Sequence, residues 1–267
     1  MPAGLLATAD WLKARGYYRQ LLSHYVSSGW LESPARGVYR RPGSPLKWQQ
    51  VVLSLQRLLK NQIHVGGRTA LVHRGLGHYV QMSGPETILL FGAHHPVAWV
   101  GRLEVPVRFE WRSDAMFHAL LESGGQQNAA QGERQSLQPA EMEAQGLSPM
   151  TWGDGDWMLL YSSEERAILE VLQDVPERES VYEAHVLMQG LVNLRPSRLM
   201  ALLQACSSIK VKRLFFALAE RHGHAWFKHL DPEAVDFGKG NRMLVRGGKL
   251  HPKYRITLPA DLDDHAR

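Results

Sequence analysis

The stretch that decides the fold runs Gly16-Tyr17-Tyr18-Arg19-Gln20-Leu21-Leu22-Ser23-His24-Tyr25-Val26-Ser27-Ser28-Gly29. Its apolar side chains recur at the i, i+1, i+4, i+5 spacing of one helical face, in the order Leu21, Leu22, Tyr25 and Val26. This spacing predicts a helix from Tyr17 to Ser28 whose apolar side faces the core. Gly29 comes next, at the position where a left-handed residue commonly ends a helix.

The chain on either side extends this helix into a longer unit. Residues 8–15 predict a short helix, capped by the Thr8 hydroxyl and ended by Gly16. After Gly29, residues 30–31 begin an extended segment, residues 33–37 form a turn with Pro and Gly, and residues 38–40 return as a second strand. Helix, glycine turn, helix, strand, turn and strand together predict a winged helix-turn-helix, which places its second helix in the major groove of DNA.

The outward side of the second helix and the wing carry the candidate DNA contacts. At about 100° per residue, Tyr18 falls near the apolar face and Arg19 at its flank, while the remaining polar side chains point away. This outward set holds no Asp or Glu, which phosphates would repel. The predicted DNA-binding residues are Tyr17, Arg19, Gln20, Ser23, His24, Ser27, Arg36, Arg40 and Arg41.

Two subsets of these residues have different expected roles. Base contacts are expected from Tyr17, Arg19 and Gln20, because the N-terminus of a recognition helix usually leads into the major groove. Arg36 at the wing tip, with the two arginines after it, is expected to hold phosphates or reach the minor groove.

Charge is distributed unevenly along the chain. The formal net charge is +5, but residues 1–113 carry 14 Lys and Arg against 5 Asp and Glu, whereas residues 114–267 carry 17 against 21. A basic N-terminal part indicates a polyanionic partner at that end of the sequence. Charges scattered over a solvated surface would give the same counts, so the charge supports the motif but does not replace it.

The rest of the chain predicts a mixed α/β part with a portion like a helical bundle, so the expected fold class is α+β. Residues 47–60 predict an amphipathic helix, residues 87–111 a small sheet, and residues 162–221 four helices. The first of those four is expected to begin at a capping box of Ser162 with Glu165. Residues 243–246 and 254–258 predict a final hairpin.

The expected domain organisation has two parts. Residues 1–95 are predicted to form the winged helix-turn-helix domain with its supporting helices, and residues 96–267 the C-terminal domain. Within the second part, residues 122–149 are rich in Gln, Gly, Ala and Glu, which predicts an exposed segment.

Signatures of enzymes, metals and cofactors are missing from the sequence. It contains neither the G-x-x-x-x-G-K-[ST] phosphate loop nor the G-x-S-x-G nucleophile elbow. His222, His224 and His229 lack the spacing and the Cys pair of a zinc site, so no catalytic residue, metal or cofactor is expected. Cys206, the only cysteine, excludes an internal disulfide and is expected in the core. With no apolar run of about 18 residues and no signal peptide at Met1, the expected location is the cytoplasm, without membrane contact.

Three stretches resemble the AbiEi antitoxin family of abortive-infection, type IV toxin–antitoxin systems. They are Gly16 to Leu31 together with Gly37-Val38-Tyr39-Arg40, then Ser208-Ile209-Lys210-Val211-Lys212-Arg213-Leu214-Phe215-Phe216-Ala217-Leu218-Ala219-Glu220-Arg221-His222, and Tyr254-Arg255-Ile256-Thr257-Leu258-Pro259. The resemblance covers most of the chain except the segment around residues 122–149. Tyr18 departs from it, because a smaller residue is expected where the turn meets the helix.

This resemblance implies a function that composition and spacing do not. It implies a DNA-binding N-terminal domain and a C-terminal domain needed for antitoxicity. It implies autorepression of an operon that also encodes a nucleotidyltransferase-like toxin, with operator DNA, expected as inverted repeats upstream of that operon, as the direct partner. It further implies that the antitoxin opposes the toxin without a stable complex.

Other functions are compatible with the same residues. The winged helix could serve protein contacts alone, or it could be the targeting module of a nucleic-acid-modifying enzyme, which lacks support from any convergent carboxylate or Cys/His motif. Lys210, Lys212 and Arg213 of the predicted helix over 210–221 would bind an acidic partner or nucleic acid, or would form a solvated basic face.

Overall fold

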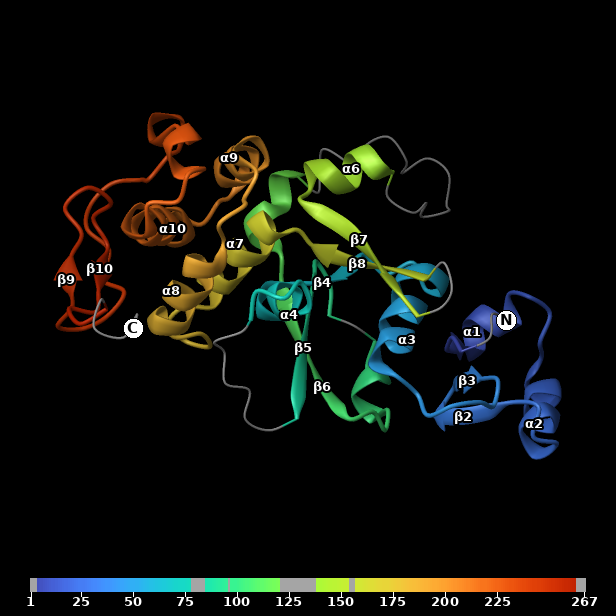
Figure 1. Cartoon of the computed structure of the whole chain (residues 1–267). Coiled ribbons are helices and arrows are strands. Elements are labelled where there is room, and N and C mark those ends of the chain that lie inside the picture. The colour runs from blue at the N-terminus through green and yellow to red at the C-terminus, as the bar shows by residue number, and fades with distance from the viewer. Residues whose placement is uncertain (1–3, 78–84, 96, 121–137, 154–156, 263–267) are drawn as a thin grey trace.

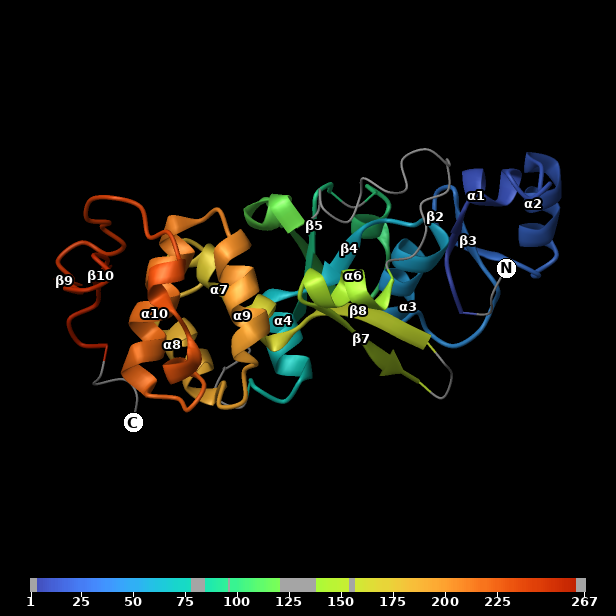
Figure 2. The ribbon, with the colours of Figure 1, turned by 90° about the horizontal axis from the view of Figure 1, so that it is seen from above.

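The computed structural model describes residues 4–77, 85–95, 97–120, 138–153 and 157–262. Figure 1 and Figure 2 show an elongated molecule with the N-terminal helices at one end, a sheet in the middle and the C-terminal helices at the other end. Within those ranges no helix is long and apolar enough to cross a membrane.

The N-terminal unit has the order of elements that the sequence predicts. Its elements are β1 (Ala7–Thr8), α1 (Ala9–Lys13), α2 (Arg19–Ser27), β2 (Glu32–Ala35) and β3 (Val38–Arg40). The strands form an antiparallel sheet in the order β1-β3-β2. Thr8 caps α1, since its Oγ1 accepts a hydrogen bond from the Trp11 amide at 3.2 Å. The wing turns on Arg36 and Gly37, and Gly37 has a φ of +75°, which favours glycine.

The wing differs from the prediction in one respect. Residues 33–35, predicted as a turn, belong to strand β2, because Ala35 pairs with Val38 and leaves only two residues for the turn. Pro34 is tolerated there because β2 is the edge strand of its sheet.

Helix α2 is held by a small core. Ala7, Leu12 and Leu22 are buried together, and Tyr17, Leu31 and Tyr39 pack around them. Of the four apolar residues predicted to face the core, only Leu22 is fully buried, and Val26 is 37% exposed. Helix α2 therefore projects from the molecule and presents most of its circumference to solvent.

One continuous helical segment joins this unit to the rest. Helix α3 (Trp48–Leu53) continues without interruption into the π-helical turn η1 (Ser54–Leu58), and together they form the amphipathic helix predicted over 47–60. Trp48, Val51 and Val52 are buried in the main core. Ser54 fixes the N-terminal strand to this helix, because its hydroxyl accepts a hydrogen bond from the Leu6 amide at 2.8 Å.

A mixed five-stranded sheet forms the middle of the molecule. Its strands, in the spatial order β6-β5-β4-β8-β7, are β4 (Ile63–Val65), β5 (Glu86–Gly92), β6 (Val107–Ser113), β7 (Leu147–Trp152) and β8 (Trp157–Ser162). The pairs β5/β6 and β4/β8 are parallel, and β4/β5 and β7/β8 are antiparallel. The predicted domain boundary near residue 95 runs through this sheet, since β4 and β5 precede it and the other three strands come after it.

Short helices connect and flank these strands. They are α4 (Gly67–His73), η2 (Val100–Arg102), η3 (Ala115–Phe117) and α6 (Pro139–Ala144). Helix α4 packs against the first helix of the C-terminal part, so the sheet and the C-terminal helices share one core.

The C-terminal part is helical, as predicted. Its helices are α7 (Glu164–Asp174), α8 (Val181–Gly190), α9 (Pro196–Ala205) and α10 (Ile209–His222), and after them come η4 (Phe227–His229), η5 (Pro232–Ala234), β9 (Lys249–Leu250) and β10 (Thr257–Leu258). Helix α10 is the centre of this part, with Leu214, Phe215 and Phe216 fully buried. Cys206 is also buried, which confirms its predicted place in the core.

Three local predictions in this half are wrong. Residues 138–149 do not form an exposed segment throughout, because α6 begins at a capping box of Gln138 with Glu141, residues 145–147 are buried, and β7 pairs with β8. Residues 122–137 of that prediction lie outside the described residues. Helix α7 is capped by Ser163, whereas Ser162 donates its hydroxyl to Glu170. The final hairpin pairs β9 with β10, because the turn at residues 247–248 comes before β9 and residues 243–246 form no strand.

Candidate nucleic-acid interface

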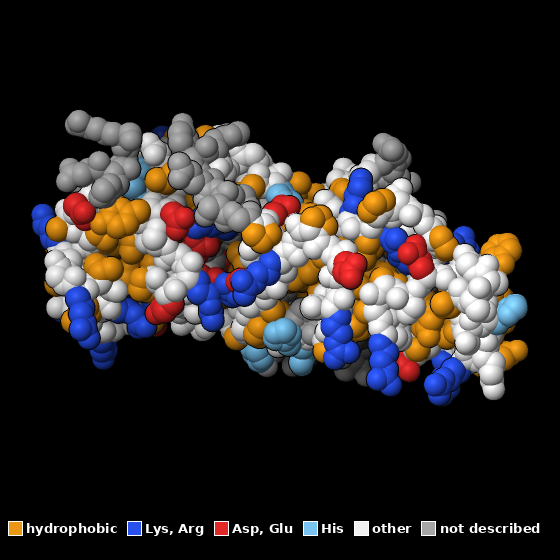
Figure 3. Space-filling view, turned by 90° about the horizontal axis from the view of Figure 1, so that it is seen from below, with side chains coloured by type: hydrophobic (Ala, Val, Ile, Leu, Met, Phe, Trp, Pro, Cys, Tyr) orange, Lys and Arg blue, Asp and Glu red, His pale blue; other side chains and the backbone are white. Residues whose placement is uncertain are grey.

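The outward face of α2 is exposed and free of acidic groups. Arg19, Gln20, Ser23, His24 and Ser27 are all exposed. No Asp or Glu occurs between Trp11 and Leu31, so the whole of α2 and its flanks carry no charge that would repel a phosphate. Figure 3 shows Lys and Arg side chains along one edge of the molecule, reaching the end that holds α1 and α2.

The positions of the Tyr17 and Tyr18 side chains relative to the core are the reverse of those predicted from the sequence. Because α2 begins at Arg19, Tyr17 lies in the turn before it, half-buried against the small core and 6.4 Å from the Tyr25 ring. Tyr18, predicted near the apolar face, is 59% exposed. Counting Tyr17 as the first helical residue rotated both side chains onto the wrong face.

The three wing arginines occupy two environments. Arg36 is exposed at the tip of the β2–β3 turn, and Arg41 is exposed just after β3. Arg40 is only 7% exposed, with its Nη2 2.9 Å from a Glu32 carboxylate oxygen and its Nη1 donating to the Ser44 carbonyl at 3.2 Å. Arg40 therefore ties the two strands of the wing to the segment that comes after them.

The sequence prediction missed two exposed groups beside α2. Lys13 is exposed in the last turn of α1, directly before the turn that leads into α2. Trp30 comes just after α2 and is 73% exposed, an unusual position for so large an aromatic side chain. Lys13 could have been found from the sequence, because it lies in the last turn of the first predicted helix. The exposure of Trp30 could not have been found in this way.

A second concentration of charge lies inside the molecule, centred on Glu170 of α7. Its carboxylate accepts hydrogen bonds from Arg166 Nε at 2.8 Å, the Gly67 amide at 2.8 Å and the Ser162 hydroxyl at 2.7 Å, and it lies 2.9 Å from His64 Nε2. Burial opposes its charge, but the contacts with His64 and Arg166 prevail and lower the pKa of Glu170 to about 2. Burial and the Arg166 charge lower the pKa of His64. This cluster joins β4, α4 and α7.

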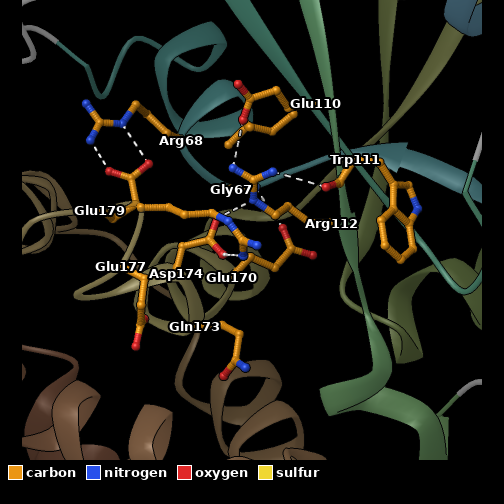
Figure 4. A network of polar contacts seen from close by, with 12 residues as sticks. Gly67, Arg68, Glu110, Trp111, Arg112, Glu170, Gln173, Asp174, Glu177 and Glu179 are labelled. Atoms are coloured by element: carbon orange, nitrogen blue, oxygen red, sulfur yellow. Dashed lines mark hydrogen bonds and ion pairs between the residues drawn. The ribbon is translucent and has the colours of Figure 1, made fainter.

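Arginine–carboxylate pairs lie around the C-terminal end of α7, near Asp174 (Figure 4). Arg68 contacts Glu179 and Glu183, with Nη1 donating to Glu183 at 3.0 Å. Arg112 donates to Asp174 at 2.7 Å and to Glu110 at 2.9 Å. Each of these carboxylates is matched by a guanidinium, so the network binds strand β6 and helix α4 to the C-terminal helices. Among the described residues no group of three or more His, Cys, Asp or Glu is placed to hold a metal ion.

The basic residues of α10 contradict both roles considered for them. Lys212 and Arg213 are 5% and 2% exposed, so they form neither a solvated face nor a binding surface. Arg213 donates to the carbonyls of Phe237, Gly240 and Arg255 at 2.7, 2.7 and 3.0 Å. Lys210 donates to the carbonyls of Gln173 and Val175 at the end of α7. These cations therefore contact backbone carbonyls of neighbouring segments, among them that of Arg255, which also accepts from the Arg242 amide at 2.8 Å.

Of the three histidines singled out in the sequence, His222 and His224 are half-buried beside the core at the same end, and His229 is exposed. His222 stacks on His185 at 4.4 Å and lies 5.6 Å from His224, which stacks on Trp226 at 5.2 Å. Burial, and to a lesser degree the two neighbouring imidazoles, lowers the pKa of His222 to about 4. His222 is therefore neutral near pH 7.

Comparisons with known proteins agree with this architecture. A family model described as a transcriptional regulator, AbiEi antitoxin, type IV toxin–antitoxin system, matches residues 86–259, and a model of the AbiEi antitoxin N-terminal domain matches residues 1–82. The chain is similar to the crystal structure of the RV2827C protein from Mycobacterium tuberculosis, with a TM-score of 0.52 and 16% identity over 94% of this chain and 85% of that one, a likeness of fold alone. A search of curated proteins finds no match. Because the two models together span almost the whole described fold, the chain belongs to the AbiEi antitoxin family of transcriptional regulators of type IV toxin–antitoxin systems.

Proposed function

We propose that this antitoxin binds operator DNA through α2 and the wing, represses its own operon, and opposes a nucleotidyltransferase-like toxin without a stable complex. The observation that carries the DNA-binding part is the exposed face of α2, which combines hydrogen-bonding side chains with a complete lack of acidic groups. In the major groove such side chains read base edges, and Arg and Gln make the most informative contacts.

The exposed cations of the wing also support the proposal that α2 lies in the major groove. A recognition helix needs phosphate contacts on its flanks to set its register on the duplex, and such contacts come mostly from Arg and Lys. Arg36 and Arg41 are exposed beside α2 in the N-terminal unit, and Lys13 adds a third cation. Arg40 is buried and Tyr17 is half-buried, which supports a role for them in positioning the wing and the α1–α2 turn.

The DNA-binding part can be tested with the full chain and a labelled duplex from the region upstream of its own gene. Fluorescence anisotropy at 50 and 200 mM salt should give tighter binding than to a shuffled duplex of the same composition. The affinity should fall steeply with salt, because each neutralised phosphate releases counterions. Equal affinity for the two duplexes, or no binding at low salt, would contradict the proposed operator contact.

The antitoxin part rests on the family and needs a separate test. Co-expression with the neighbouring nucleotidyltransferase-like reading frame should restore growth that the toxin alone arrests. Size-exclusion chromatography of the two purified proteins should show separate peaks. Growth arrest that persists with both proteins present, or a single co-eluting peak, would contradict this part without bearing on DNA binding.

A further inference from the structure

A cavity of about 580 Å³ lies where the two family-matched regions of the chain meet. Residues 56–63, at the end of the helical segment that α3 begins, form one side of it, and α6, the β7–β8 pair and the start of α9 form the other. Helix α3 packs against β8 and α6 against β7, as Figure 2 shows from above. We propose that this cavity binds a small organic anion with an apolar body, such as a medium-chain carboxylate. This site goes beyond the proposed DNA and toxin functions.

The wall after α3 has an irregular but firmly held backbone. The π-helical turn η1 ends there, and Lys60 has a φ of 53°, a left-handed conformation that is uncommon for a residue with a side chain. The Gln56 amide fixes this wall to the sheet, donating to the carbonyls of Ile63 and Leu160 at 3.1 and 3.2 Å and accepting from the Leu160 amide at 3.0 Å. Such π-turns are frequent at functional sites, and here one shapes a preformed cavity.

The inside of the cavity is suited to an apolar body. Its apolar lining consists of Ile63, Pro139, Met142, Leu147, Pro149, Met158 and Leu160. A volume of about 580 Å³ lies within the range of about 300 to 1,000 Å³ that small-molecule sites occupy. Two methionines among these residues provide adaptable walls, which suits a flexible alkyl or aryl group.

The rim of the cavity is positive, which selects the charge of the ligand. Among the described residues that line it, four are basic and only Glu143 is acidic. Arg198 and Arg195 lie 2.8 and 3.8 Å from Glu143, and Arg198 also lies 3.5 Å from Glu165, so carboxylates already neutralise these two arginines in large part. Arg57 and Lys60 are exposed and have no ion pair within the described part of the chain. An anionic head would therefore meet an excess of positive charge.

The exposed cations of the rim suit a carboxylate head. Arg57 lines the cavity and is exposed, so its guanidinium is accessible to an anionic head. Guanidinium groups bind carboxylates through charge-assisted hydrogen bonds.

Calorimetric titration of the full chain can separate the two parts of this proposal. Decanoate carries both the charge and the apolar body, acetate and inorganic phosphate carry only the charge, and decanol carries only the body. Decanoate should bind at one site per chain, decanol should bind at least about tenfold more weakly, and acetate and phosphate should give no measurable heat. Binding of phosphate as tight as that of decanoate would overturn the apolar part, and equal binding of decanol would overturn the anion part.

Variants locate the binding in this cavity. Arg57→Glu with Lys60→Glu should weaken decanoate binding at least about tenfold, and Met142→Trp should abolish it by filling the cavity. Lys228→Glu with Arg246→Glu makes the same charge change on exposed residues elsewhere and should leave the affinity within about twofold. No decanoate binding to the wild-type chain, or binding that neither cavity variant changes, would overturn the site. Decanoate binding is measured without DNA. A failure of the proposed operator binding would therefore not change the outcome of this titration.

Discussion

Helices α2 and α10 both carry cations that the sequence places on a helical surface, and the fold uses them in opposite ways. On α2, Arg19 is exposed in a helix of which only Leu22 is buried. On α10, Arg213 is 2% exposed and donates to three backbone carbonyls. The cause of the difference is the next segment of the chain in each case. The short wing comes after α2, whereas residues 223–262 come after α10 and include the three carbonyls to which Arg213 donates.

A basic helix therefore indicates a nucleic-acid surface only where no later segment covers it. The carbonyls that Arg213 holds lie 24, 27 and 42 residues further along the chain, so no local pattern announces them. Burial and the charges of Arg255 and Arg242 lower the pKa of Arg213. In α2 the absence of acidic residues over a long local stretch was the more reliable signal.

The largest expected effect is a difference in the free energy of unfolding between a variant of α10 and a variant of α2. Arg213→Ala removes a buried guanidinium that donates to three backbone carbonyls, of which that of Arg255 keeps another donor, the Arg242 amide. This loss should lower the free energy of unfolding by roughly 3 kcal/mol. Arg19→Ala, on an exposed face, should change it by less than about 0.5 kcal/mol. Urea denaturation monitored by circular dichroism measures both. Equal stability of the two variants would mean that the hydrogen bonds of Arg213 do not stabilise the fold.

The second effect is on sequence-specific DNA binding and should appear at α2 alone. Arg19→Ala with Gln20→Ala should weaken binding to the upstream duplex by about 2 kcal/mol, roughly thirtyfold, because two base-edge contacts are lost. Binding to a shuffled duplex should change much less. The matched control, Lys228→Ala on the exposed surface of the other end, should leave both affinities unchanged. An equal loss on both duplexes would make these residues phosphate contacts instead.

The accuracy of the sequence prediction depends on the range of the interactions involved. The helix-turn-helix was predictable because its signals are local: apolar spacing, the Thr8 cap and the glycines that end each helix. The exposed candidates on α2 were predictable for the same reason. The roles of Arg40 and Tyr17 were not, because the first depends on the register between β2 and β3 and the second on where α2 begins. The cavity was beyond prediction, since its two sides come from distant parts of the sequence, before Val65 on one side and after Gln138 on the other.

A third, smaller effect concerns pH and the end of α10. The pKa of His222 is about 4 in the folded chain and about 6.5 when unfolded. Because the unfolded state takes up the proton first, stability should fall as the pH drops from about 6.5 toward 4. Since His222 is partly exposed, we expect a loss of about 1 to 2 kcal/mol.

Urea denaturation at pH 7 and pH 5 tests this expectation against His222→Gln. The variant should lose less stability between the two pH values than the wild type, though not none, because burial lowers the pKa of His64 and acts in the same direction. The same pH slope in both proteins would show that the stacked histidines do not carry the effect.

The smallest effect should come from the wing and should be visible mainly in its salt dependence. Arg36→Ala removes one exposed cation from the turn between β2 and β3, so the slope of log affinity against log salt should fall by about 0.9, the value for one phosphate contact on duplex DNA. The loss should be nearly the same for the upstream and the shuffled duplex, because a phosphate carries no sequence information. Lys228→Ala removes an equal charge from the other end of the molecule and should leave the slope unchanged. If Arg36→Ala instead lowered affinity for the upstream duplex alone, the wing would read sequence, and the division of roles between α2 and the wing would have to be reversed.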